Sequence, residues 1–282
     1  MSALAMTRFG SNGTILRARG GDTLDLDIIR AKAPSVFAEE KHHSRSEKYT
    51  YIPTSDILQA MLNEGFFPTE VRQGGSRDEE KRGFTKHLIR FRQAGVVAVV
   101  GDTFPEIALV NSHDGTSSYQ ILPAWFRFTC ANGMYVSEFS GQPFKVNHRG
   151  NADDVIEASY KVIDEFPKQA SQIEEFKQLQ LTGPEQQAFA ETAISLRWEE
   201  GQVQPYQVLR QRRREDADNS LWMTFNKIQE NVTQGGTRVE SYTPERGRSV
   251  RRSRAVNSVS ENVKINQALW LLTEKIAALK AA

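Results

Sequence analysis

The sequence predicts an α+β fold, with an antiparallel β-meander core in the N-terminal half and a helix-rich C-terminal half. Two observations predict it. The stretches 84–92, 106–111 and 119–130 read as strands, and the turn signals Asp114-Gly115 and Asn132-Gly133 lie between strands. Beyond residue 151, apolar residues instead recur at helical spacing. We therefore expect residues 1–150 to be mainly antiparallel sheet and residues 151–282 to be mainly helical, packed on the sheet as one unit.

The N-terminal half has one helical signal among its strands. Residues 55–63 carry apolar side chains at helical spacing, with Thr54 as the predicted N-cap and Gly65 as the stop. The charged, glycine-flanked stretch 74–83 has little to bury, and we expect a mobile loop there. The predicted strands, in chain order, are residues 14–19, 66–72, 84–92, 106–111, 119–130 and 134–139.

Four amphipathic stretches predict the helices of the C-terminal half. Each carries an apolar stripe, and proline at position 184 suits the first turn of a helix. Asn266 falls on the stripe of the last stretch, where a satisfied buried amide is expected. The predicted helices are residues 152–166, 184–198, 221–232 and 256–279.

Composition limits the cellular and chemical setting. The 282 residues contain no apolar run near the ~18 residues of a membrane span, and the first residues lack the order of a secretory signal. The single cysteine, Cys130, cannot form an internal disulfide, and it excludes multi-cysteine metal sites. We expect a cytoplasmic protein that does not associate with membranes.

The net charge of +1 conceals two oppositely charged regions. Residues 151–204 contain eleven acidic and four basic side chains, a net of −7. The basic segment, residues 205–254, contains eleven basic and six acidic side chains, a net of +5. Such blocks indicate a solvated surface or pairing between regions, or else a basic face that is offered to a polyanion.

One predicted loop contains several side chains that could take part in catalysis or ligand binding. It contains Asn111, His113 and Asp114 beside four hydroxyl residues. Neighbouring residues diverge, so His113 and Asp114 are poorly placed for a base–orienter pair, and Asp114-Gly115 is a typical turn. We therefore assign no catalytic residue, and the loop remains a candidate contact for phosphates or bases. Whether the chain is an enzyme stays open.

Metal and cofactor signals are weak. The five histidines show no His-x-His or His-x-x-x-His spacing, and no phosphate-binding Gly-Lys-Ser/Thr loop is present. We predict no metal ligands and no cofactor. A site assembled from His113, Asp114 and His148 is the remaining alternative.

The arginines suggest a nucleic-acid surface. Lys86, Arg90 and Arg92 share one side of a predicted strand, and Arg127 stands among aromatic residues. Interleaved basic and aromatic side chains suit single-stranded nucleic acid. The alternatives are solvated runs, a snorkelling arginine, or Arg127 paired with an interior carboxylate.

The basic segment supplies two further clusters. Arg210, Arg213 and Arg214 would share a face if that stretch is helical. Arg251, Arg252 and Arg254 are spaced among glycine and serine residues and should be mobile unless a partner holds them.

Several short motifs follow one another in a fixed order along the chain. The central ones are Asn111, His113-Asp114-Gly115-Thr116-Ser117, Phe126-Arg127 and Cys130-Ala131-Asn132-Gly133-Met134, with flanking motifs in residues 84–92, 221–236 and 252–270. Together they resemble the phage- and plasmid-borne family catalogued as domain of unknown function 932, over residues 35–280. The resemblance implies a mobile-element protein, a class that commonly manages DNA, and it assigns no catalytic residues.

These observations yield three hypotheses. The leading one is a DNA-handling protein that binds single-stranded DNA and promotes annealing or recombination as a homo-oligomer. A compact antiparallel sheet with basic strands is also similar to single-strand annealing proteins, although fold alone does not fix function. The second is a metal-assisted phosphoesterase, and the third is an interaction module that blocks a host defence protein through the −7 region.

Overall fold

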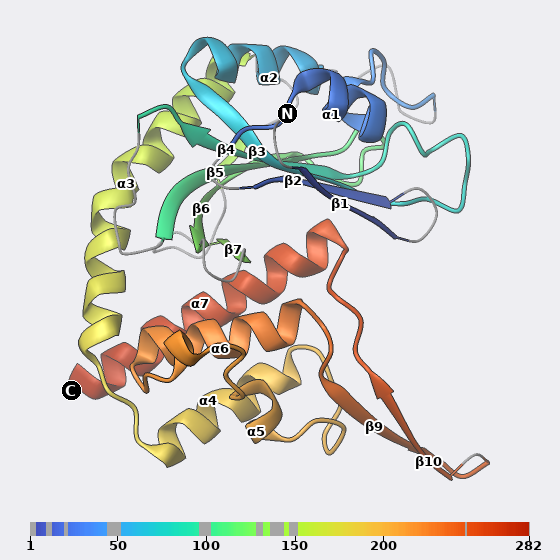
Figure 1. Cartoon of the computed structure of the whole chain (residues 1–282). Coiled ribbons are helices and arrows are strands. Elements are labelled where there is room, and N and C mark those ends of the chain that lie inside the picture. The colour runs from blue at the N-terminus through green and yellow to red at the C-terminus, as the bar shows by residue number, and fades with distance from the viewer. Residues whose placement is uncertain are drawn as a thin grey trace. The chain divides into compact units, whose positions relative to one another are not determined.

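A computed structural model represents the chain. It describes residues 4–9, 13–19, 22–43, 52–95, 103–127, 132–135, 144–146, 152–245 and 247–281. The fold is α+β, with the sheet in the N-terminal half and most helices in the C-terminal half, as predicted (Figure 1). Contacts divide it into two compact units. Unit 1 is Met1–Pro167 with Asn257–Val259, and unit 2 is Lys168–Val256 with Ser260–Ala282.

Unit 1 contains an eight-stranded antiparallel sheet. The spatial order from β1 to β7 follows the chain, and β8 pairs with β6, so the predicted meander is confirmed. The strands are β1 Leu4–Phe9, β2 Gly13–Ala18, β3 Phe66–Gln73, β4 His87–Gln93, β5 Thr103–Asn111, β6 Tyr119–Arg127, β7 Asn132–Tyr135 and β8 Phe144–Val146.

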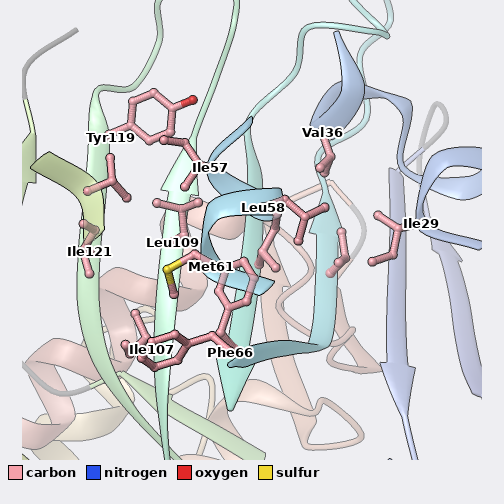
Figure 2. Close-up of a cluster of buried hydrophobic side chains, with 14 of the residues drawn as sticks. Ile29, Val36, Ile57, Leu58, Met61, Phe66, Ile107, Leu109, Tyr119 and Ile121 are labelled. Atoms are coloured by element: carbon pink, nitrogen blue, oxygen red, sulfur yellow. The ribbon is translucent and has the colours of Figure 1, made fainter. Parts of the chain in front are cut away.

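Helices cover one face of this sheet. They are α1 Leu26–Lys32, the 3-10 helix η1 Pro34–Phe37, α2 Thr54–Asn63 and the first half of α3 Ala152–Gln178. Ile57 and Met61 of α2 lie beside Leu109 of β5, in a buried cluster that also contains Leu58 and Ile107 (Figure 2). Burying this apolar surface fixes which side of each strand faces the helices, because strand side chains alternate.

The opposite face of the sheet is polar. Since Ile89 and Phe91 pack in the helix-covered core, Arg90 between them points to the other side. A β-bulge interrupts the β3–β4 register between Pro68 and Glu70. Bulges re-aim side chains, and this one directs Thr69 to the same polar side as Glu70.

Unit 2 is built around α6. Its buried aromatic side chains stack or meet edge to edge, with Phe225 between Trp222 and Trp270. Asn266 is buried, accepts from Gln229 and donates to the Asn262 carbonyl, so the predicted satisfied amide is confirmed. The elements after α3 are α4 Gly183–Ser195, α5 Pro205–Val208, the 3-10 helix η2 Arg214–Asp216, α6 Leu221–Thr233, β9 Arg238–Thr243, β10 Gly247–Arg252 and α7 Val259–Ala281.

Several local predictions were wrong. Pro53, not Thr54, occupies the N-cap position of α2, and Thr54 is the first helical residue. Asn132 and Gly133 lie inside β7 rather than in a turn. The helix predicted at 152–166 continues past Pro167 to Gln178. No helix in the described part of the chain is long and apolar enough to cross a membrane.

The basic segment also departs from expectation. Helix α5 ends at Val208, so Arg210, Arg213 and Arg214 do not share a helical face. The stretch predicted to be mobile forms β10, which pairs with β9 in a two-stranded hairpin. Its strands show little apolar alternation, and of the hairpin's valines Val239 is buried while Val250 is half exposed. The usual strand signal is therefore missing from this part of the sequence.

Candidate functional site

On the polar face of unit 1, arginines surround a buried carboxylate. Glu70 is fully buried and accepts from Arg17 Nε at 2.6 Å. Arg90 Nη2 lies 3.0 Å from the same carboxylate, and Arg72 Nε donates to its other oxygen. Three neighbouring strands thus supply one cluster, because Arg17, Glu70 and Arg90 stand directly opposite one another in the register.

A second carboxylate extends the cluster. Glu106 on β5 accepts from Arg92 Nη2 at 2.8 Å and from the Thr69 hydroxyl at 3.0 Å. The guanidinium of Arg92 also lies 4.7 Å from the centre of the Phe104 ring, and that of Arg90 lies 4.7 Å from the centre of the Phe126 ring. These contacts hold both arginines in place.

The electrostatics keep these groups charged. Burial by itself would raise the pKa of Glu70, but Arg17, Arg72 and Arg90 outweigh it and hold that pKa well below its usual range. Burial would lower the pKa of Arg90, yet Glu106 and Glu70 raise it. A buried carboxylate stays ionised only while the cationic side chains around it compensate its charge.

The basic residues that were predicted to line this sheet differ in burial and in the face that they occupy. Arg90 is 1% exposed and the Arg92 side chain is 12% exposed, and both pair with Glu106, so neither stands on an exposed surface. Lys86 is half-buried. Arg127 is 5% exposed and, by strand alternation, shares the helix-covered face with Trp125. They do not form one exposed basic row.

The predicted ligand loop is also divided. Thr54 Oγ1 lies 3.0 Å from His87 Nε2, 3.1 Å from His113 Nε2 and 3.1 Å from Asn111 Nδ2, and all four residues are fully buried. Asp114 instead stays in its own turn, where it accepts from the Thr116 amide and hydroxyl. His113 and Asp114 therefore have different partners.

The hydrogen positions in this histidine cluster follow from its partners. His87 Nδ1 lies 3.2 Å from the Thr85 carbonyl, which can only accept, so His87 carries its proton on Nδ1. Its Nε2 is then an acceptor, and the Thr54 hydroxyl lies within reach of this nitrogen at 3.0 Å and of the Tyr119 hydroxyl oxygen at 3.2 Å. Thr54 has two lone pairs left, which accept from Asn111 Nδ2 and from His113 Nε2–H.

This network has a structural consequence and a pH dependence. It ties the first residue of α2 to β4, β5 and the loop after β5. Burial lowers the pKa of His87 to about 4, against the opposing effect of its bond to Thr85, so His87 is neutral near pH 7. The arrangement fits an interior support of the fold.

One group could hold a metal ion among the described residues. His42, His43 and Glu80 bring three ligand atoms within 4.8 Å of one another. Exposed His43 and Glu80 approach to 3.9 Å, whereas His42 is buried against Phe84. The alternative set predicted from sequence does not assemble from His113 and Asp114, and its third member, His148, lies outside the described residues.

In unit 2 the first arginine cluster is partly occupied. Arg213 makes a two-pronged pair with Glu230, at 2.6 and 2.9 Å, and also reaches Asp216. Its pKa is raised, first by the Glu230 hydrogen bonds. Arg213 is therefore paired with carboxylates, whereas Arg210 and Arg214 are exposed.

A pocket of about 400 Å³ lies beside these residues. Its wall includes no carboxylate residue. Arg212 donates to Asn231 and to the Gly235 carbonyl, and Arg252 donates to the Gly236 carbonyl, which orients both guanidinium groups. The lining residues are Tyr206, Gln207, Arg210, Arg212, Asn231, Gly235, Gly236, Thr237, Arg238 and Arg252.

The β9–β10 hairpin continues this basic surface. Arg238 stands directly opposite Arg252, and Tyr242 directly opposite Arg248, so all four share one side of the hairpin. Tyr242 is 75% exposed. Glu240 pairs with both Arg238 and Arg248. Arg251 lies on the other side of the hairpin, and Arg254 follows it as an exposed residue.

Sequence reasoning missed several members of these sites. Glu70 and Glu106 were not singled out, although charged residues inside apolar strands are a signal of buried pairing. Tyr206 and Arg238 were also missed, because they join the pocket only through the packing of α5 and β9 beside α6. No local spacing in the sequence reports that contact.

Comparison with known proteins gives close relatives of undefined activity. The model of a family described as "Domain of unknown function (DUF932)" matches residues 41–270. UPF0380 protein YafZ of Escherichia coli (strain K12) is 41% identical over 279 residues, which is 98% of each chain. UPF0380 protein YfjQ of the same strain is 40% identical over the same shares. No solved structure matches.

Proposed function

The chain belongs to the family described as domain of unknown function 932, and we propose that it binds single-stranded nucleic acid through unit 2. The binding surface is the arginine-lined pocket together with the β9–β10 hairpin. DNA of a mobile element is the expected substrate, which rests on the family resemblance alone.

One observation carries the proposal: four arginines line one pocket whose wall contains no carboxylate. Arg238 and Arg252 stand directly opposite each other on paired strands, and Glu240 pairs with Arg238, whereas no ion pair of Arg252 is found among the described residues. A phosphate backbone would supply a counter-charge, because the planar guanidinium matches phosphate oxygens in two-pronged fashion.

Exposed aromatic side chains favour a single strand over a duplex. Tyr206 is 72% exposed in the wall of the pocket, and Tyr242 is 75% exposed on the hairpin. Such rings stack on unpaired bases, whose faces are hidden in a duplex. Arginines that track the backbone beside rings that stack on bases form the usual platform for single strands.

The binding test compares two double variants with equal charge change. Arg210→Ala/Arg252→Ala alters the pocket, whereas Arg8→Ala/Arg77→Ala removes two exposed arginines of unit 1. Fluorescence anisotropy follows a labelled oligonucleotide of about 20 nucleotides at low salt. We expect the pocket variant to bind at least about tenfold more weakly and the control to bind like the wild type. Equal binding by all three proteins would contradict the proposal.

Further arms of the same experiment define the substrate. Duplex DNA should compete poorly with single-stranded DNA, and single-stranded RNA tests whether the sugar is read. Annealing by an oligomer is the finer form of the proposal. It predicts faster pairing of complementary strands with rising protein concentration, together with a sedimenting species larger than one chain.

A further inference from the structure

The polar face of the unit 1 sheet carries unbalanced buried charge. Among the mostly buried side chains described there, four are arginines and two are carboxylates, which leaves a net charge of +2. The six are Arg17, Arg72, Arg90, Arg92, Glu70 and Glu106. Uncompensated charge in a protein interior is strongly unfavourable, and the described residues of this face supply no counter-charge for the excess.

Hydrogen-bond donors on the same face also lack acceptors. Arg90 Nη1, Arg92 Nε and the Tyr135 hydroxyl are buried and have no hydrogen-bond partner among the described residues. Arg90 Nε lies 3.2 Å from Glu106 Oε2, an ion pair without the alignment of a hydrogen bond. Buried donors are normally satisfied, and each unsatisfied one calls for an explanation.

The register brings these donors toward one place. Glu106, Ala124 and Tyr135 stand directly opposite one another on β5, β6 and β7, so their side chains share the polar face. The small Ala124 separates the two larger residues. Tyr135 on β7 also interacts electrostatically with Arg72 on β3, four strands away in the sheet order. The sheet curls from β4 to β7 (Figure 1), so its polar face is concave.

We propose that this concave face binds a small oxyanion of the phosphate class, held by Arg90, Arg92 and the Tyr135 hydroxyl. Each contributes a donor that has no hydrogen-bond partner in the described part of the chain, and the two guanidinium groups supply the charge that the anion balances. Bound water could satisfy the donors but would leave the +2 charge in place. The side chains of Arg17 and Arg92, which are 20% and 12% exposed, mark where the face reaches solvent.

This site does not depend on the nucleic-acid surface, because it lies in unit 1 and uses none of the pocket arginines. Two sources of the anion are distinguished by the test. Inorganic phosphate alone represents the ion itself, and a nucleoside monophosphate represents the phosphate group of a nucleotide. Tighter binding of the nucleotide would identify the site as a nucleotide subsite.

The variant Tyr135→Phe is designed to remove one donor with little change in shape. Without phosphate we expect it to be at least as stable as the wild type, because it loses an unsatisfied buried hydroxyl. We expect the dissociation constant for phosphate to be about tenfold higher in this variant than in the wild type, because one hydrogen bond to a charged group is lost. The matched control is Tyr119→Phe. In the wild type the buried Tyr119 hydroxyl donates to the Ile52 carbonyl on the other face of the sheet.

Equilibrium dialysis with radiolabelled phosphate and thermal unfolding at constant ionic strength are the two measurements. The wild type and Tyr119→Phe should bind one phosphate tightly and gain thermal stability in a saturable way, beyond the effect of chloride. Arg210→Ala/Arg252→Ala should retain this site even if it no longer binds nucleic acid. No saturable binding by the wild type, or equal affinity in Tyr135→Phe, would overturn the proposal.

Discussion

The arginines of the two units differ in what they already hold. In unit 1, Arg90 is 1% exposed and lies between Glu70 and Glu106. In unit 2, Arg210 and Arg252 are exposed around a pocket without a carboxylate in its wall. The same side chain thus stabilises the interior in one unit and presents charge to solvent in the other. The difference is set by the carboxylates nearby and not by the density of arginines in the sequence.

This comparison predicts that removing a charge affects stability in unit 1 and ligand binding in unit 2. Removing one carboxylate from the unit 1 cluster should damage folding, because it leaves buried arginines unpaired. Removing charge from the unit 2 surface should leave folding intact and change only binding, because exposed pairs contribute little to stability.

The largest effect is expected for Glu70→Gln. The change preserves shape but leaves Arg17, Arg72 and Arg90 without their shared carboxylate, and breaking such a buried pair costs about 3–5 kcal/mol. Urea unfolding measures the loss. The matched control, Glu240→Gln on the exposed hairpin, should lie within about 0.5 kcal/mol of the wild type. Similar losses in both variants would remove the distinction between the units.

The next effect is a loss of stability in acid that originates in unit 1. The pKa of His87 is about 4 in the folded chain and near its ordinary value of 6.5 in the unfolded chain. Between these values the unfolded state binds more protons, so stability falls as pH decreases from about 6.5 to about 4, by about 3 kcal/mol. Urea unfolding across this range measures it. His87→Gln, which can still accept from Thr54, should lose less stability over the same range, and an unchanged loss would contradict the assignment.

A third test concerns the backbone that frames the pocket. Both Gly235 and Gly236 have positive φ, at 78° and 84°. An added Cβ at Gly235 would come within 2.6 Å of the Arg254 carbonyl carbon, whereas one at Gly236 would meet no atom within 4 Å. Gly235→Ala should therefore be about 2 kcal/mol less stable than Gly236→Ala. Equal stabilities in thermal unfolding would show that the chain does not pass so closely here.

The smallest effect on stability is expected at Tyr206. Because its ring is mostly exposed, Tyr206→Ala should change unfolding by less than about 0.5 kcal/mol. Oligonucleotide affinity should nevertheless decrease by about 1 kcal/mol, the lower end of the range for one stacked base. Tyr160→Ala, an exposed tyrosine of unit 1, serves as the control and should leave affinity unchanged. Unaltered affinity in Tyr206→Ala would remove stacking from the proposal.

The sequence was sufficient for the meander and the main helices, because alternation and helical periodicity report local burial. It correctly placed Arg90 and Arg92 on the same side of one strand. It could not reveal that Glu70 and Glu106 meet Arg90, since those contacts depend on strand register. The role of Thr54 was misjudged for a related reason: its hydroxyl satisfies buried side chains that lie far away in the sequence.

The hairpin shows the converse limit. Residues 247–252 contain arginine, serine and glycine with one valine, which predicts a mobile segment. Pairing with β9 supplies backbone hydrogen bonds that no side-chain pattern reports. The pocket was equally hidden, because Tyr206, Arg212 and Arg252 come together only after α5, α6 and the hairpin have packed.

The most direct test of the central claim is the salt dependence of oligonucleotide binding. Each phosphate contact lowers the slope of log K against log salt by about 0.7 for single strands. Arg210→Ala/Arg252→Ala should therefore flatten the slope by about 1.4 relative to the wild type, while Arg8→Ala/Arg77→Ala should leave it unchanged. A wild-type protein with no salt-dependent binding, or equal slopes in the wild type and both variants, would contradict the account.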